Sequence, residues 1–237
     1  VIKPNMAWER TPDRAANTNP DVVAALVEMC VAAGAARVKV IEHTISPNPR
    51  PAYEMSGIAE AAKRAGAQVL FVDQERFHEL PIPNGKALKS WPFYEDFVFA
   101  DRVDVLINVP AAKHHSTSRL SMGLKNVFGM IGGERGALHK DIHPKIADLN
   151  RVLKIDLTVL DAYRILTQHG PSGNSLADVD NSPQRARRIV VSTDPVAVDA
   201  YGATLFGLKP DDIGFIREAH EAGLGELDFK VTAELAV

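Results

Sequence analysis

The sequence has only one cysteine, Cys30, among its 237 residues. A single thiol cannot form an intrachain disulfide, and it cannot hold an iron–sulfur cluster, which takes about four ligands. No apolar run approaches the roughly 18–20 residues that a membrane-spanning helix requires. The net charge is only -3, which argues against a general surface for nucleic acid or anionic membranes. We therefore expect no iron–sulfur cluster within this chain, no membrane span and no nucleic-acid partner.

The first residues carry no signal-like segment. They read Val-Ile-Lys-Pro-Asn, which is typical of a strand and its end, with no charged region or apolar signal core before it. A cytoplasmic and an exported location therefore both stay open. Hydrophobic residues make up 46% of the sequence, enough for a full core. The length fits one large or two small domains, and we favour a single α/β domain over residues 1–237.

Short β-branched runs alternate with segments of helical spacing in this sequence. Strands are expected at 1–3, 38–41, 68–72, 104–109, 157–160 and 188–192. Helices are expected at 21–33, 51–64, 120–128, 142–153, 195–205 and 211–222. This order predicts a mainly parallel sheet with helices on both faces, a Rossmann-like three-layer architecture. Residues 77–91 contain two prolines and a glycine and show no period, which indicates a loop or short hairpin, while 93–100 fit a strand or a short helix. We interpret residues 74–103 together as an irregular insertion.

Residues 110–143 form the segment that we expect to bear the site. The segment holds four of the eight histidines and follows a predicted buried strand. Open α/β sheets bind ligands outside the carboxyl ends of their strands, at one common edge. Polar residues follow several of the predicted strands: Asn5, Glu42, His43, Asp73, Lys113, His114, Asp161 and Asp194.

Cationic side chains and glycines are grouped within this segment. Lys113, Lys125 and Arg135 lie near the glycine-rich stretch 129–136, and lysine charges with exposed backbone N–H groups favour phosphate or carboxylate. The glycines match neither of the common phosphate-binding patterns, so solvated lysines on a flexible loop are the alternative. Asn126 stands in an otherwise apolar patch, where a buried amide must find hydrogen-bond partners.

The histidines suggest a second kind of site. His139 and His143 are four residues apart, so on a helix they would share one face and could hold a divalent metal with His114 or His115. The alternative is that Pro144 keeps His143 out of a helix. These histidines would then be exposed loop residues.

Two aspartates and one acid–histidine pair have open roles. Asp194 precedes Pro195, which is typical of a helix N-cap, although it could also face a ligand. Asp199 lies within the same predicted helix and could face the sheet edge. Glu42 and His43 are disfavoured as an acid–base pair because adjacent strand residues point in opposite directions.

These residues also carry a resemblance to a known family. The chain resembles the prokaryotic family called domain of unknown function 362, which implies an α/β fold and a biochemical role that is mostly unassigned. Some members carry ferredoxin-like cysteine clusters or twin-arginine export signals, and neither is found here. The resemblance gives weight to the residues at motif positions: Lys113, His114, Lys125, Asn126, His139, Asp194 and Asp199. The matching segments are 2–5, 19–20, 110–114, 124–129, His139, 148–149, Asp161, 170–173, 194–199 and 223–225.

Three functional hypotheses follow, and the sequence does not decide whether the chain is an enzyme. In the first, Lys113 and Lys125 hold a small carboxylate or phosphate, and His114 or His139 moves a proton near neutral pH. Asn5 and Asn126 would bind and orient the ligand, while Asp194 and Asp199 would hold a histidine tautomer, a lysine or a divalent ion. In the second, the chain is a metal-binding protein. In the third, it is a non-catalytic accessory module for an iron–sulfur redox partner. Substrate, metal and oligomeric state stay open.

Overall fold

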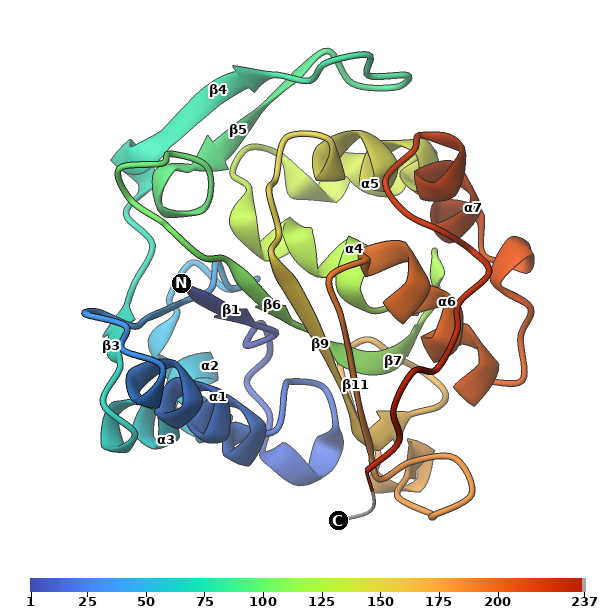
Figure 1. Ribbon diagram of the computed structural model, residues 1–237, viewed down its shortest axis with the longest axis horizontal. Coiled ribbons are helices and arrows are strands. Elements are labelled where there is room, and N and C mark those ends of the chain that lie inside the picture. Colours follow the sequence, from blue (N-terminus) through green and yellow to red (C-terminus); the bar gives the residue numbers. More distant parts are fainter. Residues whose placement is uncertain (236–237) are drawn as a thin grey trace.

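The computed structural model describes residues 1–235, which form a nine-stranded, mainly parallel sheet covered by helices on both faces (Figure 1). The main strand order is β3-β2-β1-β6-β9-β7-β8, and β10 and β11 pair antiparallel with β9. The predicted three-layer α/β architecture is therefore confirmed. The strands are β1 (Ile2–Pro4), β2 (Lys39–Ile41), β3 (Gln68–Leu70), β6 (Ile107–Val109), β7 (Ala111–His115), β8 (Arg119–Ser121), β9 (Leu157–Leu166), β10 (Val179–Asp180) and β11 (Arg188–Ser192).

The strand order reverses direction beside β1. From β1 the chain proceeds outward to β2 and β3, and it then returns to place β6 on the other side of β1. Ile2 is thus paired in parallel with Val40 on one side and with Ile107 on the other. In sheets of this kind, the loops that leave two such strands diverge and open a crevice at their carboxyl ends.

The helices divide between the two faces of the sheet. One group packs with β1 and β2 around a core that includes Val23, Val40 and Ile58, and the other packs on β9 around Leu160 and Phe215. None of the helices within residues 1–235 is long and apolar enough to cross a bilayer. The first group contains α1 (Pro20–Ala32), α2 (Arg50–Met55) and α3 (Ile58–Arg64), and the second α4 (Gly123–Asn126), α5 (Ile142–Asn150), α6 (Pro195–Leu205) and α7 (Gly214–Glu221).

The single helix expected over 51–64 is two helices in the structure. Gly57 separates α2 from α3 and has a φ of +71°, in the left-handed region that glycine adopts without strain. The helical spacing of apolar residues continues across this break, so the pattern did not reveal it.

The helix expected over 120–128 is also partly wrong. Residues 119–121 belong to strand β8, which pairs antiparallel with β7, and only the short α4 and a 3-10 turn (Val127–Met130) follow. Strand β9 is longer than the expected 157–160, because β11 pairs with it as far as Ala162, and β7 and β10 pair with it as far as Leu166. Asp161 therefore lies inside β9 and not at the end of the strand. Its carboxylate accepts hydrogen bonds from the backbone N–H groups of Asn19 (2.7 Å) and Tyr163 (3.0 Å).

The segment 74–103 contains a β-hairpin, β4 (Phe77–Pro81) with β5 (Ser90–Tyr94), so the hairpin alternative is confirmed. Its connecting loop is fastened to α5 by one carboxylate. Asp148, 1% exposed, accepts hydrogen bonds from the backbone N–H groups of Lys86 (2.9 Å), Ala87 (2.6 Å) and Leu88 (2.9 Å).

Replacing this carboxylate should destabilise the fold. Asp148→Ala leaves three N–H groups without their acceptor, so we expect the free energy of unfolding to fall by about 2–4 kcal/mol. Urea unfolding followed by circular dichroism measures this change. Asp101→Ala, at an exposed aspartate, serves as the control and should change stability by no more than about 0.5 kcal/mol. Equal effects of the two variants would contradict the role given to Asp148.

Candidate functional site

A cavity of about 540 Å³ opens beyond the carboxyl ends of β1 and β2. Asn5, which follows β1, and Glu42 and His43, which follow β2, line one side of it. The opposite side comes from residues between 113 and 139, within the segment expected to bear the site. A volume of this size suits a small organic molecule.

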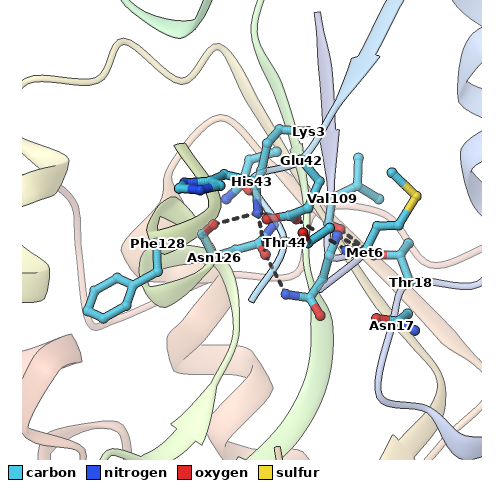
Figure 2. A network of polar contacts seen from close by, with 12 residues as sticks. Lys3, Met6, Asn17, Thr18, Glu42, His43, Thr44, Val109, Asn126 and Phe128 are labelled. Carbon is cyan, nitrogen blue, oxygen red and sulfur yellow. Dashed lines mark hydrogen bonds and ion pairs between the residues drawn. The ribbon is translucent and has the colours of Figure 1, made fainter. Parts of the chain in front are cut away.

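A buried lysine lies beneath this cavity. Lys3, on β1, is fully buried, and its Nζ lies 2.8 Å from Oε2 of Glu42 (Figure 2). Nζ also donates to the main-chain oxygen of Asn126 (2.6 Å) and to its Oδ1 (2.8 Å). Burial lowers the pKa of Lys3, and the charge of Glu42 opposes that shift. The backbone N–H of Met6 donates to the same Glu42 oxygen (3.2 Å), so hydrogen bonds support both members of the ion pair.

Asn126 connects this ion pair to the rest of the site. Its Oδ1 accepts a hydrogen bond from Nδ2 of Asn5 (2.9 Å), in addition to the one from Lys3 that Figure 2 shows. Its Nδ2 donates to Oδ1 of Asn108 (2.8 Å), whose own Nδ2 donates to the carbonyl of Gly123 (2.9 Å). The partners expected for an amide in an apolar patch are therefore present. They fix which way the amide of Asn126 points.

Lys113 is held between the cavity and the loop that joins β1 to α1. It lies on β7, is 2% exposed, and donates to Oδ1 of Asn5 (2.7 Å) and to the carbonyl of Ala16 (2.6 Å). Both acceptors are neutral. Burial, reinforced by the charge of Lys125, lowers the pKa of Lys113 to about 7.

Lys125 lines the cavity without any such partner. It lies on α4, is 8% exposed, and its Nζ lies 4.5 Å from the centre of the Phe128 ring. Within residues 1–235, Nζ of Lys125 makes no hydrogen bond or ion pair, unlike Nζ of Lys3 and Lys113. Burial first, and then the charges of Lys3 and Arg135, lowers the pKa of Lys125 to about 7.

Arg135 supplies a further cation to the cavity wall. Its guanidinium donates to the carbonyls of His43 (2.8 Å), Phe128 (3.0 Å) and Thr44. These bonds tie the glycine-rich stretch to the loop after β2. Burial lowers the pKa of Arg135, and the charge of Glu42 partly offsets that effect. The arginine is paired with carbonyl dipoles and not with a carboxylate.

The cavity consequently has an excess of positive charge. Lys3 is neutralised by Glu42, while Lys113, Lys125 and Arg135 contact no carboxylate within the described residues. The other acid that lines the cavity, Glu134, is exposed. Three partly or fully buried cationic groups therefore line a cavity in which none of them pairs with a carboxylate of residues 1–235.

Two neutral imidazoles form another part of the wall. The rings of His115 and His139 are stacked, with centroids 5.6 Å apart. Nδ1 of His115 accepts hydrogen bonds from the backbone N–H groups of Thr117 (3.1 Å) and Ser118 (3.3 Å), which places the proton of this ring on Nε2. Burial, followed by the charge of Lys125, lowers the pKa of His115 to about 2. Burial also lowers the pKa of His139, so both rings are neutral at pH 7.

Glu42 and His43 point apart, as expected for neighbouring residues at a strand end. Nδ1 of His43 lies 2.7 Å from the carbonyl of Ile131 and donates to it. Burial and the nearby Arg135 lower the pKa of His43 to about 4. His43 is therefore a neutral, fixed ring whose Nε2 accepts a hydrogen bond from Nε2 of Gln74 (3.4 Å).

Gly129 gives the Lys3–Glu42 pair the room that it needs. A Cβ at this position would lie 1.7 Å from Oε1 of Glu42 and 2.6 Å from Cε of Lys3. The backbone N–H of His43 also donates to the carbonyl of Gly129 (3.0 Å). Only glycine lets the main chain pass this close to a buried ion pair.

Two of the predicted ligand-binding residues lie outside the cavity. Asp199 is fully buried on α6 and accepts hydrogen bonds from the backbone N–H groups of Gly123 (2.7 Å) and Leu124 (2.9 Å). It thus holds the first turn of α4, which carries Lys125, and burial raises the pKa of Asp199 to about 7. Asp194 is the N-cap of α6, where it accepts from the N–H of Ala197 (2.9 Å). The cap role that the sequence favoured is confirmed.

His114 and His143 also point away from the cavity. His114 alternates with Lys113 and His115 along β7, so it faces the other side of the sheet, where Nδ1 accepts from the N–H of Gly170 (3.2 Å). His143 stacks on Phe215 in the core contact between α5 and α7, with centroids 6.3 Å apart. The expectation that Pro144 keeps His143 out of a helix is wrong, because Pro144 falls in the first turn of α5, where its missing N–H is not needed.

The expected metal ligands do not come together. His139 ends a 3-10 turn (Arg135–His139), and Asp141, with a φ of +52°, separates it from α5, so His139 and His143 do not share a helix face. No group of three histidine, cysteine, aspartate or glutamate side chains within residues 1–235 is placed to hold a metal ion.

The sequence reasoning missed Lys3 and Asn108 as site residues. Each is a single polar residue inside a short apolar strand, in Ile-Lys-Pro and Ile-Asn-Val. A lysine or asparagine at the centre of a parallel sheet must have a buried partner. That interruption of an apolar run was the available signal.

Comparison with known proteins places the chain in a family. It is 22% identical over 251 residues to the thylakoid-associated protein sll1697 of Synechocystis sp. (strain ATCC 27184 / PCC 6803 / Kazusa). The aligned region covers 100% of this chain and 71% of that protein. The family model "Domain of unknown function (DUF362)" matches residues 1–204. This match includes every residue that lines the cavity. The chain belongs to the DUF362 family, as the resemblance of its motifs had suggested.

Proposed function

We propose that this protein binds a small organic anion, a carboxylate or a phosphate, in the cavity at the carboxyl edge of the sheet. The observation that supports this most strongly is Lys125, a residue only 8% exposed that lines the cavity and whose Nζ has no hydrogen-bond acceptor within the described residues. A buried cation without a partner lowers stability. An anion in the cavity would supply the missing charge and acceptors.

The donors that remain free suit such a ligand. An ammonium has three N–H groups, and Lys113 uses two of them on Asn5 and Ala16, which leaves one. A guanidinium has five, and Arg135 uses three on carbonyl groups. Together with Lys125, these residues offer charged donors from three separate segments. Carboxylate and phosphate oxygens accept charge-assisted hydrogen bonds of this kind.

The neutral histidines would allow the cavity to donate a hydrogen bond to a ligand and to accept a proton from it. Nε2–H of His115 is a fixed uncharged donor, and His139 is a neutral ring at pH 7 that can accept a proton. Of the two histidines expected to move protons, His139 lines the cavity and His114 does not. We therefore assign the proton-accepting role to His139.

Anion binding can be measured directly with variants of Lys125. Isothermal titration of the protein with inorganic phosphate, malonate and citrate should show binding of at least one of them. Lys125→Gln should weaken that binding by roughly 30-fold or more, because a buried charge contact to the ligand is lost. Lys154→Gln, at a lysine whose side chain is 89% exposed, is the matched control and should leave affinity unchanged. Equal affinities of all three proteins would refute the proposal.

The affinity should fall as the pH rises. In the free protein the pKa of Lys125 is about 7, and a bound anion favours the charged form and raises that pKa. Binding is therefore strongest below about pH 7 and weakens by up to tenfold per pH unit above it, with uptake of a proton. Lys113, whose pKa is also lowered to about 7, contributes to the same titration, and the charges of Lys3 and Arg135 lie near Lys125.

Proton uptake is measured by titrating the ligand in two buffers of different ionisation enthalpy at about pH 8. Lys125→Arg keeps the charge at every pH, so in this variant the uptake should be smaller. A pH-independent affinity in the natural protein would show that Lys125 does not contact the anion.

Without ligand, the same lysine should weaken the fold. Its pKa is lower in the folded protein than the ordinary 10.5, so the folded state binds fewer protons between about pH 7 and pH 10.5, and stability rises with pH across that window. Lys125→Met should therefore be more stable than the natural protein at about pH 7, by roughly 1–3 kcal/mol. The gap should narrow toward about pH 10, as the natural lysine loses its proton. Urea unfolding at these two pH values measures the difference in the free energy of unfolding between the two proteins. A difference that grows with pH would contradict the assignment.

A further inference from the structure

Lys125 differs from the other buried amines near the cavity in one respect. Lys3 is fixed by Glu42 and by two acceptors on Asn126, and Lys113 is fixed by two acceptors. Nζ of Lys125 lies 4.5 Å from the centre of the Phe128 ring and makes no hydrogen bond or ion pair with residues 1–235. The residue is 8% exposed, and it lines an open cavity of about 540 Å³. Nothing in the described residues holds its lone pair or its protons in a hydrogen bond.

The surroundings of this amine favour its neutral form. Burial of the residue lowers the pKa of the amine, and Lys3 and Arg135 add positive charge nearby. A lysine that is desolvated beside other cations is the kind that acts as a nucleophile toward carbonyl carbon. The amines of Lys3 and Lys113 cannot serve in this way, because their hydrogen bonds engage them elsewhere.

We propose that Lys125 forms an imine with the carbonyl carbon of a small oxo acid whose carboxylate or phosphate is held in the cavity by Lys113 and Arg135. This inference rests on the proposed anion binding and names the substrate class for it. The three residues line the same cavity. One group of the substrate would meet fixed cationic donors while its carbonyl group faces the unbound amine.

The reaction balances without any further reagent. The Nζ lone pair forms a bond to the carbonyl carbon, and a proton passes from nitrogen to the carbonyl oxygen, which gives a carbinolamine. The carbon–oxygen bond then breaks, and the hydroxyl group leaves with one proton as water. The product is a carbon–nitrogen double bond, and no atom changes its oxidation state overall. Nε2–H of His115 is a neutral hydrogen-bond donor in the same wall for the substrate oxygen.

Borohydride trapping tests this inference. The whole protein is incubated at about pH 7 with pyruvate, glyoxylate or 2-oxoglutarate and sodium cyanoborohydride, and the product is mapped by peptide mass spectrometry. We expect one reduced adduct on Lys125, with labelling at least about tenfold above that of any exposed lysine, because an ordinary lysine has less than about 0.1% free amine at this pH. Lys154→Arg should leave the adduct on Lys125 unchanged. Lys125→Arg should abolish it.

Lactate, malonate and phosphate have no aldehyde or ketone group, so their binding distinguishes this inference from the proposed function. If these acids bind in a Lys125-dependent way and no oxo acid is trapped, the anion site stands and the imine is refuted. If adducts spread over exposed lysines at similar levels, the imine is also refuted. The mapping of adducts on the natural protein decides whether the imine forms, without relying on the folding of a variant. An adduct on Lys113 in place of Lys125 would overturn the assignment of the nucleophile.

Discussion

The buried ion pair between Lys3 and Glu42 is the contact on which the rest of the site depends. It joins β1 to the loop after β2, and through Asn126 it fixes α4 against both. A buried pair of charges is favourable only when further hydrogen bonds satisfy its remaining atoms. Here Asn126 and the backbone N–H of Met6 do so, and Gly129 leaves the space. Lys3 is thereby neutralised, while the cations above it are not.

The site and the core make opposite contributions to stability. Two helix layers bury apolar residues on both faces of the sheet, whereas the cavity collects Lys113, Lys125 and Arg135 without a matching carboxylate. Selection for stability alone would replace such lysines with apolar residues. Their presence in a protein of net negative charge agrees with the proposal that a ligand supplies the missing counter-charge. The same reasoning accounts for Asp199, which uses a buried carboxylate to hold the turn that presents Lys125.

The layer architecture and the location of the cavity could be predicted from the sequence, because apolar periodicity reports strand and helix order and parallel strands end at one edge. Which polar residues meet there could not be predicted so well. The direction of His114 depends on β7, a strand that alternation did not reveal, and the place of His143 depends on the start of α5 after Asp141. Asp199 serves α4 through a contact 75 residues apart in sequence. Lys3 and Asn108 were overlooked because each interrupts a strand only three residues long.

The reversal of strand order beside β1 has a further consequence. The cavity wall on one side comes from loops after β1 and β2, and on the other from residues 113–139, so the two walls belong to segments far apart in the sequence that the β1–β6 pairing and the hydrogen bonds of Asn126 and Arg135 bring together. A molecule bound between them would act as a further cross-link between the first part and the middle of the chain. Local opening of either part would then require its release, so occupancy would slow backbone amide exchange in both segments together.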